Sequence, residues 1–223
     1  MTKQFKHNFV SLPDLETETI NGKRHYLVGS SKLPSVTTIL DGTSDKTWLQ
    51  EWKNRVGEEE AERISTKAKN KGTLLHKMAE DFVLNKPVDE SSPIAMMTFL
   101  PIKKALEERV DDILLVEGCL WSKKLGTAGR CDLVAHWDGK PAIIDYKTSS
   151  SIKHESHIQD YFIQTSMYAY MFWERTGILV DDIIILMSTS DIPEPQIFHK
   201  RVFDYIRDAR ARIRAYEALQ RGV

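Results

Sequence analysis

The stretch Thr127–Ser149, TAGRCDLVAHWDGKPAIIDYKTS, decides the fold class. Apolar segments lie on both sides of Asp138–Gly139, a dipeptide that favours a tight turn between two strands. The apolar run Ala142–Ile144 suits a strand that is buried inside a sheet. The sequence therefore predicts an antiparallel hairpin, with strands over residues 127–137 and 140–147.

Ionisable residues interrupt these apolar strands. Asp132 lies in the first strand, and Asp145 and Lys147 lie two positions apart in the second, so they point to the same face. The hairpin brings Asp132 towards Asp145, and neighbouring carboxylates repel each other unless a cation compensates them. Mg²⁺ or Mn²⁺, which prefers oxygen ligands, supplies that charge, and Lys147 then orients an attacking water or offsets phosphoryl charge. The alternative is a structural ion pair at a solvated strand end.

The rest of the chain predicts helices and strands around this hairpin. The pair Asn21–Gly22 predicts an N-terminal hairpin, and Gly57 and Gly72 are expected to interrupt the helical region. A crossover helix before the strand 183–188 makes that strand parallel to the strand 140–147. This order predicts an α/β fold with a mixed central sheet and helices on its faces. The expected helices cover 46–55, 58–70, 73–84, 94–110, 157–175 and 202–219, and the other strands cover 17–20, 24–28 and 113–121.

Composition excludes several classes of protein. The longest purely apolar run, Ile183–Met187, is much shorter than the roughly 20 residues of a membrane span, and Met1–Val10 lacks the apolar stretch of a secretory signal. Cys119 and Cys131 are too few for a disulfide framework. We therefore expect a cytoplasmic or other intracellular, reducing location. The formal net charge of −1 excludes a polybasic protein but permits a local basic groove.

Motifs along the chain carry a resemblance to a known family. The segments Gly129–Asp132 and Ile144–Ser149 are preceded by Pro34–Thr37, a P-S-V-T element, and by Gly72–Glu80, a G-x-x-x-H pattern. They are followed by Gln164–Tyr168, a Q-x-x-x-Y pattern. In this order they resemble the PD-(D/E)XK nuclease superfamily. More narrowly, they resemble its RecB-like exonucleases, a group that includes the mitochondrial genome maintenance exonuclease.

The resemblance implies an αβββαβ nuclease core and roles for its residues. Asp132 and Asp145 would ligate the metal beside the backbone carbonyl of Tyr146, and Lys147 would be the catalytic lysine. His76 would complete the metal or phosphate site. Some relatives carry a four-cysteine iron–sulfur cluster, but this chain has only two cysteines, so no cluster is expected.

Further candidate residues are weighed against simpler roles. Glu117 is either an outer metal ligand or an exposed strand residue. His76 is either a ligand near a helix start at Gly72, which would suit phosphate, or a partly buried histidine. Aromatic and cationic residues such as Trp48 suit single-stranded nucleic acid, but they can also pack into a core or be solvated. The candidate nucleic-acid contacts are Gln164, Tyr168, Ser35, Thr37, Thr148, Lys71 and Trp48.

The sequence thus predicts a Mg²⁺- or Mn²⁺-dependent DNA exonuclease that prefers single-stranded ends or flaps and serves DNA replication, repair or recombination. We expect one nuclease domain over residues 1–223, in which 1–110 covers the active site and 111–223 forms the catalytic core. DNA is the expected partner, with no membrane and a monomeric state, and the compact size is compatible with a phage source. The alternatives are a non-catalytic nucleic-acid-binding module, a dimeric endonuclease and a small-substrate phosphohydrolase.

Overall fold

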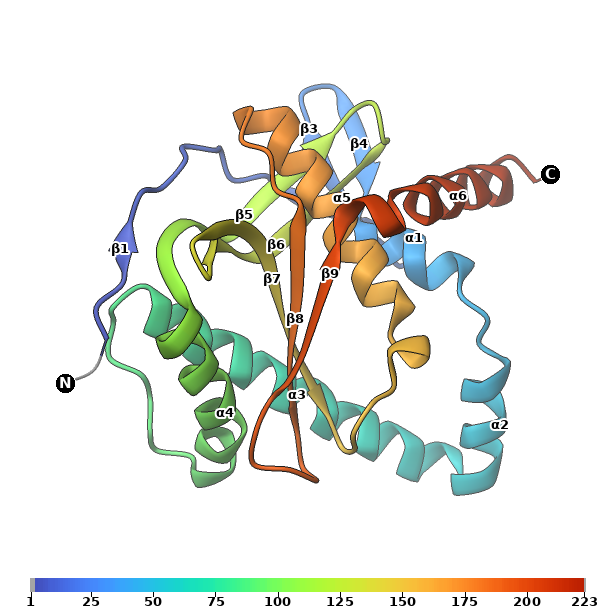
Figure 1. Ribbon diagram of the computed structural model, residues 1–223. Helices are drawn as coiled ribbons and strands as arrows, with labels where there is room; N and C mark the ends of the chain where they lie inside the picture. The colour runs from blue at the N-terminus through green and yellow to red at the C-terminus, as the bar shows by residue number, and fades with distance from the viewer. Residues whose placement is uncertain (1–2, 223) are drawn as a thin grey trace.

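The computed structural model describes residues 3–222 and has a mixed β-sheet at its centre (Figure 1). Within these residues the sheet has six strands, in the order β1-β5-β6-β7-β8-β9. The strands are β1 (Lys6–His7), β5 (Val110–Ser122), β6 (Thr127–Trp137), β7 (Lys140–Ser149), β8 (Asp182–Thr189) and β9 (Gln196–Arg201). The predicted α/β class with a mixed central sheet is confirmed.

The hairpin of β6 and β7 forms as its turn residues predict. Asp138 and Gly139 both have positive φ, at 50° and 79°, and Trp137 pairs with Lys140. Positive φ at both positions gives a turn whose twist matches that of the strands. The paired register runs on to Leu133 opposite Ile144, so Asp132 and Asp145 come next along their strands.

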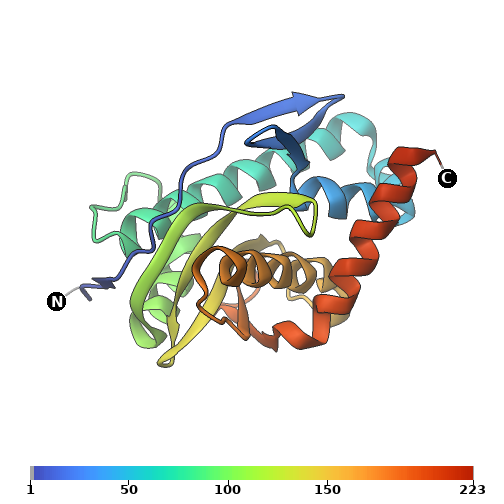
Figure 2. The ribbon, with the colours of Figure 1, turned by 90° about the horizontal axis from the view of Figure 1, so that it is seen from above.

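Helices cover both faces of this sheet, and Figure 2 shows α3 and α5 on opposite sides of it. The helices α3 (Glu58–Val83) and α4 (Pro93–Arg109) bury their apolar stripes against one face. The helices α1 (Val36–Thr43), α5 (Gln159–Thr176) and α6 (Val202–Arg221) pack on the other. Since α5 connects β7 to β8 across that face, these two central strands are parallel.

A small antiparallel sheet of β2 (Thr17–Ile20), β3 (Lys23–Val28) and β4 (Ser31–Pro34) packs near β5 and β6. Asn21 and Gly22 both have positive φ, which confirms the predicted N-terminal hairpin. The remaining elements are α2 (Thr47–Val56) and the 3₁₀ turn η1 (Glu155–His157).

The expected helix break at Gly72 is wrong, because α3 is continuous over 26 residues. The second half of α3 buries Leu75, Met78 and Phe82 against the sheet. This burial outweighs the roughly 1 kcal/mol that glycine costs inside a helix. Gly72 therefore does not lie at a helix start, and the phosphate site expected there on that basis is also wrong.

The sequence analysis did not predict β1, β4 and β9. β1 has only two residues, β4 follows β3 after a tight turn, and β9 is an edge strand in which only Phe198 is fully buried. Strands this short or this polar carry little hydrophobic pattern.

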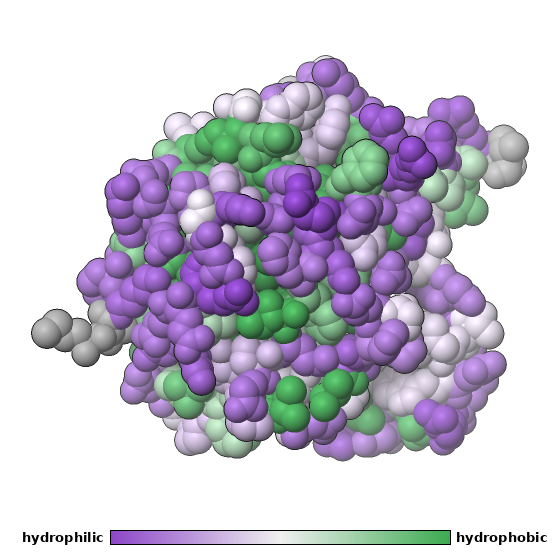
Figure 3. Space-filling view, viewed as in Figure 1, coloured by the Kyte–Doolittle hydropathy of each residue, from purple (hydrophilic) through white to green (hydrophobic). Residues whose placement is uncertain are grey.

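The surface is mainly polar on the face that Figure 3 shows, where apolar side chains lie scattered in small groups. Across residues 3–222, no helix combines the length and the apolar character that crossing a bilayer requires.

Candidate active site

Three side chains meet between helix α3 and two interior strands of the sheet. His76 comes from α3, Glu117 from β5 and Asp132 from β6, and one ligand atom from each lies within 4.8 Å of the others. His76 Nδ1 lies 3.4 Å from Asp132 Oδ2 and 3.8 Å from Glu117 Oε1. The other ring nitrogen, Nε2, lies 3.0 Å from the carbonyl oxygen of Tyr146. The structure therefore groups His76, Glu117 and Asp132, and His76 also contacts the Tyr146 carbonyl.

Glu117 reaches this cluster through an unusual backbone conformation. Its φ of 45° is in the left-handed region, which costs a non-glycine residue about 1–2 kcal/mol. The next residue must be small, because a Cβ on Gly118 would lie 2.3 Å from the Leu115 side chain. The guanidinium of Arg130 donates to the Glu117 carbonyl oxygen and so holds the strained peptide in place.

Asp145 and Lys147 form a buried pair beside this cluster. Asp145 is only 1% exposed, and the Lys147 ammonium contacts its Oδ2. Lys147 Nζ also lies 4.8 Å from the ring centroid of Tyr161 on α5. Among residues 3–222, Asp145 Oδ1 has no hydrogen-bond partner. The pair lies on one face of β7, as the two-residue spacing predicts, while Tyr146 packs in the core of the opposite face.

The peptide of Tyr146 links the pair to the cluster. Its N–H donates to Asp132 Oδ2 at 2.9 Å, and its carbonyl faces His76. Asp145, the preceding residue, is not part of the compact His76–Glu117–Asp132 group. The predicted residues thus form two connected sets: Asp132, Glu117 and His76 in one, and Asp145 and Lys147 in the other.

Burial and mutual charge set the protonation states of these groups. Burial and repulsion from Asp132 raise the pKa of Asp145 to about 6, although Lys147 opposes the shift. Burial alone would also raise the pKa of Asp132, but the hydrogen bond and charge of His76 hold it below its usual value. Burial lowers the pKa of His76, yet the Asp132 and Glu117 carboxylates more than compensate and raise it to about 10. Likewise, the pKa of Lys147 is raised by Asp145 and Asp132 despite burial.

These residues fit a hard divalent cation. The compact group offers the carboxylates of Asp132 and Glu117 and the imidazole of His76, with the Tyr146 carbonyl beside it, and carboxylate and carbonyl oxygens suit Mg²⁺ or Mn²⁺. The Asp145 oxygen that lacks a partner is the kind of buried acceptor that an ion would satisfy.

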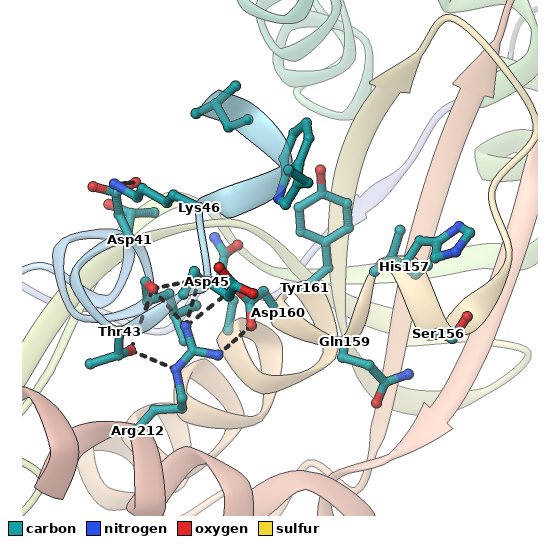
Figure 4. A pocket seen from close by; sticks show the side chains of 17 residues that line it. Asp41, Thr43, Asp45, Lys46, Ser156, His157, Gln159, Asp160, Tyr161 and Arg212 are labelled. Atoms are coloured by element: carbon teal, nitrogen blue, oxygen red, sulfur yellow. Dashed lines mark hydrogen bonds and ion pairs between the residues drawn. The ribbon is translucent and has the colours of Figure 1, made fainter. Parts of the chain in front are cut away.

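A cavity of about 540 Å³ is lined by Tyr161 (Figure 4), the residue that contacts Lys147. Tyr161 and Gln164 of α5 line it, as does Trp48 of α2, whose ring is 65% exposed. In Figure 4, Arg212 of α6 donates to Asp160 and to the C-terminal end of α1. These bonds fix the start of α5, which carries Tyr161 to Lys147.

The other predicted nucleic-acid contacts have different environments. Tyr168 is 3% exposed, packs against Gly129 and accepts a hydrogen bond from Gln164. Ser35 is buried and caps α1 by accepting from the Thr38 N–H.

Three further predicted contacts lie nearer to solvent. Thr37 is exposed, next to Ser35 in the first turn of α1. Lys71 is half-buried and donates to Ser190, and Thr148 lies near Gly72 of α3. The structure therefore places Thr37, Lys71, Gln164 and Trp48 where solvent reaches them, and Ser35 and Tyr168 inside the protein.

Two residues of the site were not singled out by the sequence analysis. Arg130 lies inside the quoted Gly129–Asp132 motif, but nothing in its position along the chain shows that it binds the Glu117 carbonyl. Tyr161 lies three residues before Gln164, so helical periodicity places both on one side of α5. Its contact with Lys147 depends on how α5 packs on the sheet.

Comparisons with known proteins bear on the family of this chain. A family model for the PD-(D/E)XK nuclease superfamily matches residues 101–215. A crystal structure of a proposed exonuclease from Eubacterium rectale is similar, with 12% sequence identity, 68% coverage of each chain and a TM-score of 0.46. No curated protein matches the chain. The matched region runs from the end of α4 into α6, and it contains Glu117, Asp132, Asp145 and Lys147. With more than half of its length matched, this chain belongs to the PD-(D/E)XK nuclease superfamily.

Proposed function

We propose that this nuclease is a Mg²⁺- or Mn²⁺-dependent DNA exonuclease that acts on single-stranded ends or flaps. The observation that carries the proposal is the arrangement around the Tyr146 peptide. Asp132 and His76 bind its N–H and carbonyl, and Asp145 and its partner Lys147 lie directly before and after Tyr146 on the same strand. We also propose that Asp132, Asp145, Glu117 and His76 hold the ion and that Lys147 is the catalytic lysine.

The roles of the side chains follow from their charges. An ion held here supplies positive charge that polarises a phosphodiester and activates water. Lys147 stays protonated at neutral pH because Asp145 and Asp132 raise its pKa, so it can offset the charge that develops on the phosphoryl oxygens. Tyr161 contacts the lysine from α5 and restricts its position.

The cavity beside the active site supports a single-stranded substrate. The exposed ring of Trp48 and the side chain of Lys46 lie in its wall, near Tyr161. Aromatic rings stack on unpaired bases, and cations contact the backbone phosphates. A flexible single strand can bend into a cavity of this size more easily than a duplex.

The decisive assay is digestion of end-labelled, linear single-stranded DNA with Mg²⁺, with Mn²⁺ and with EDTA. The proteins compared are the wild type, Asp132→Ala, Lys147→Ala and the control Lys140→Ala, which changes an exposed lysine on the same strand. We expect metal-dependent cleavage by the wild type and the control, and at least a hundredfold loss in the other two. Equal activity in all four proteins would exclude the proposed site.

Substrate topology separates an exonuclease from an endonuclease. An enzyme that requires an end degrades linear strands and leaves circular single-stranded DNA intact. Cleavage of the circle favours the endonuclease alternative, and metal-independent binding without cleavage favours a non-catalytic module. Parallel reactions with an RNA strand test the preference for DNA, and the elution volume in gel filtration tests the expected monomer.

A further inference from the structure

Besides Lys147, a second cationic side chain lies near the candidate active site. It is Arg130 of β6, which lines a pocket together with residues of α3. An open pocket of about 570 Å³ adjoins the metal-ligand cluster, and Arg130 lines it together with His76 and Glu117. Lys77, another cation in its wall, already donates to Glu80 and Asp81 on its own helix. Arg130 is therefore the better placed of these two side chains to meet an anion that enters the pocket.

The Arg130 guanidinium has two different partners. One terminal nitrogen donates to the carbonyl oxygen of Glu117. The other donates to Asp14 Oδ1 at 2.6 Å. A guanidinium has five N–H donors in a rigid fork, so it can keep the carbonyl contact while it exchanges the second partner.

Asp14 is an exposed carboxylate held over this arginine by its neighbours in the chain. Its side chain is 75% exposed, whereas Leu12 and Leu15 pack against separate apolar clusters. The thiol of Cys119 also donates to Asp14 Oδ1. The N-terminal segment thus places a solvated acid beside the active-site pocket, where the backbone of a nucleic acid would bring a phosphate.

We propose that Arg130 binds a backbone phosphodiester of the nucleic-acid substrate next to the scissile bond, and that Asp14 occupies its guanidinium until the phosphate displaces it. This inference rests on the proposed function, because it needs a nucleic acid in the same site. The contact of Arg130 with the Glu117 carbonyl remains in both states. Arg130 then has two roles: it contacts the substrate, and it positions the peptide of a proposed metal ligand.

Binding measurements test this exchange independently of catalysis. The probe is a fluorescein-labelled single-stranded DNA without terminal phosphates, titrated in EDTA and followed by fluorescence anisotropy at several salt concentrations. The proteins are the wild type, Arg130→Gln, Asp14→Asn and the double variant. The control is Arg109→Gln, because Arg109 forms a similar surface pair with Asp138 at the far end of β6.

We expect Arg130→Gln to weaken DNA binding about tenfold and to reduce the slope of log Kd against log salt by about 0.7. Asp14→Asn should tighten binding about twofold to fivefold, since it removes a competing surface ion pair. In the Arg130→Gln background, adding Asp14→Asn should leave the Kd for DNA unchanged. Arg109→Gln should bind like the wild type.

Other results overturn the inference. If Asp14→Asn leaves the Kd unchanged or weakens binding, Asp14 does not compete with the phosphate. If Arg130→Gln binds DNA normally but has a lower kcat with Mn²⁺, the arginine only positions Glu117. If the wild type cleaves DNA but the Kd values of the Arg130 and Asp14 variants do not change as expected, only this inference is wrong. A wild type that neither binds nor cleaves DNA removes the proposed function as well.

Discussion

At the scale of single residues, the proposed site contains groups whose burial opposes folding of the metal-free protein. The Asp145 carboxyl is buried with one oxygen that has no hydrogen-bond partner among residues 3–222. Burial and the nearby Asp132 raise its pKa to about 6. A buried carboxylate with an oxygen that lacks a partner supports the proposal that Asp145 helps to hold a cation.

We therefore predict that the stability of Asp145→Asn relative to the wild type, measured in EDTA, increases with pH. The pKa of Asp145 is higher in the folded state than in the unfolded chain, so its favourable contribution is present at low pH and is lost as the pH rises through about 6. Asparagine lacks this dependence. The Tm of the variant minus that of the wild type should increase between pH 5 and pH 8, measured by thermal unfolding in EDTA.

The same variant should respond less than the wild type to added metal. Mn²⁺ should raise the Tm of the wild type, since a ligand that binds only the folded state stabilises it, and should raise that of Asp145→Asn much less. Asp41→Asn, which alters an exposed carboxyl, is the matched control. A Tm difference that does not change with pH would contradict the sign of the Asp145 shift.

The residues of the site were only partly predictable from the sequence. Asp145 and Lys147 are two apart on a strand, and this spacing alone predicts that they lie on one face. The hairpin turn further brings Asp132 near them. By contrast, the contact of Arg130 with Glu117 depends on a backbone φ of 45°, and no pattern of residue types specifies that conformation.

At the scale of elements, helix α3 shows why a break was wrongly expected. Glycine lowers helix propensity, but Gly72 precedes a stripe of residues that is buried on the sheet. Tertiary packing therefore decides the conformation of this segment, and it continues the helix that delivers His76. Helices and strands were predictable where the hydrophobic pattern extends over many residues. The prediction failed for β1 and β9, because these strands are short or polar.

Two glycine substitutions should have effects of opposite sign. In Gly72→Ala the added Cβ lies 4.0 Å from Thr148 Oγ1, an ordinary contact, so we expect a gain of about 0.5–1 kcal/mol in the free energy of unfolding. In Gly129→Ala the Cβ would lie 2.7 Å from the buried ring of Tyr168, so we expect a loss of about 1–3 kcal/mol. Urea denaturation measures both, and destabilisation by Gly72→Ala would contradict the continuous helix.

At the scale of the whole molecule, Arg212 connects segments that are far apart in the chain. From α6 it donates to Asp160 at the start of α5 and to the Leu40 carbonyl and Ser44 hydroxyl at the end of α1. Arg212→Met should lower the free energy of unfolding by about 2 kcal/mol, because it removes several hydrogen bonds to partly buried acceptors and the charge that pairs with Asp160. Arg210→Met, at an exposed position of the same helix, should have little effect in the same denaturation experiment.

The arrangement of the apolar core argues that the N-terminal region and the catalytic core fold as one unit. Phe5, Leu75 and Phe99 from the first 110 residues share a buried cluster with Ile144 and Ile184 of the central strands. Without α3 and α4, that face of the sheet would be exposed to water. Each Å² of apolar surface exposed in this way would cost about 25 cal/mol of free energy.

We therefore predict a single unfolding transition for the whole chain. Trp48 and Trp52 report on the N-terminal region, whereas Trp121, Trp137 and Trp173 report on the core. One variant lacks the N-terminal tryptophans and a second lacks the core tryptophans, so the fluorescence of each reports on one region. The urea midpoint of each variant should coincide with its midpoint from far-UV circular dichroism. An earlier midpoint for the N-terminal tryptophans would mean that α2 and its surroundings unfold separately. His76 on α3 would then reach Asp132 only when two independently folding parts came together.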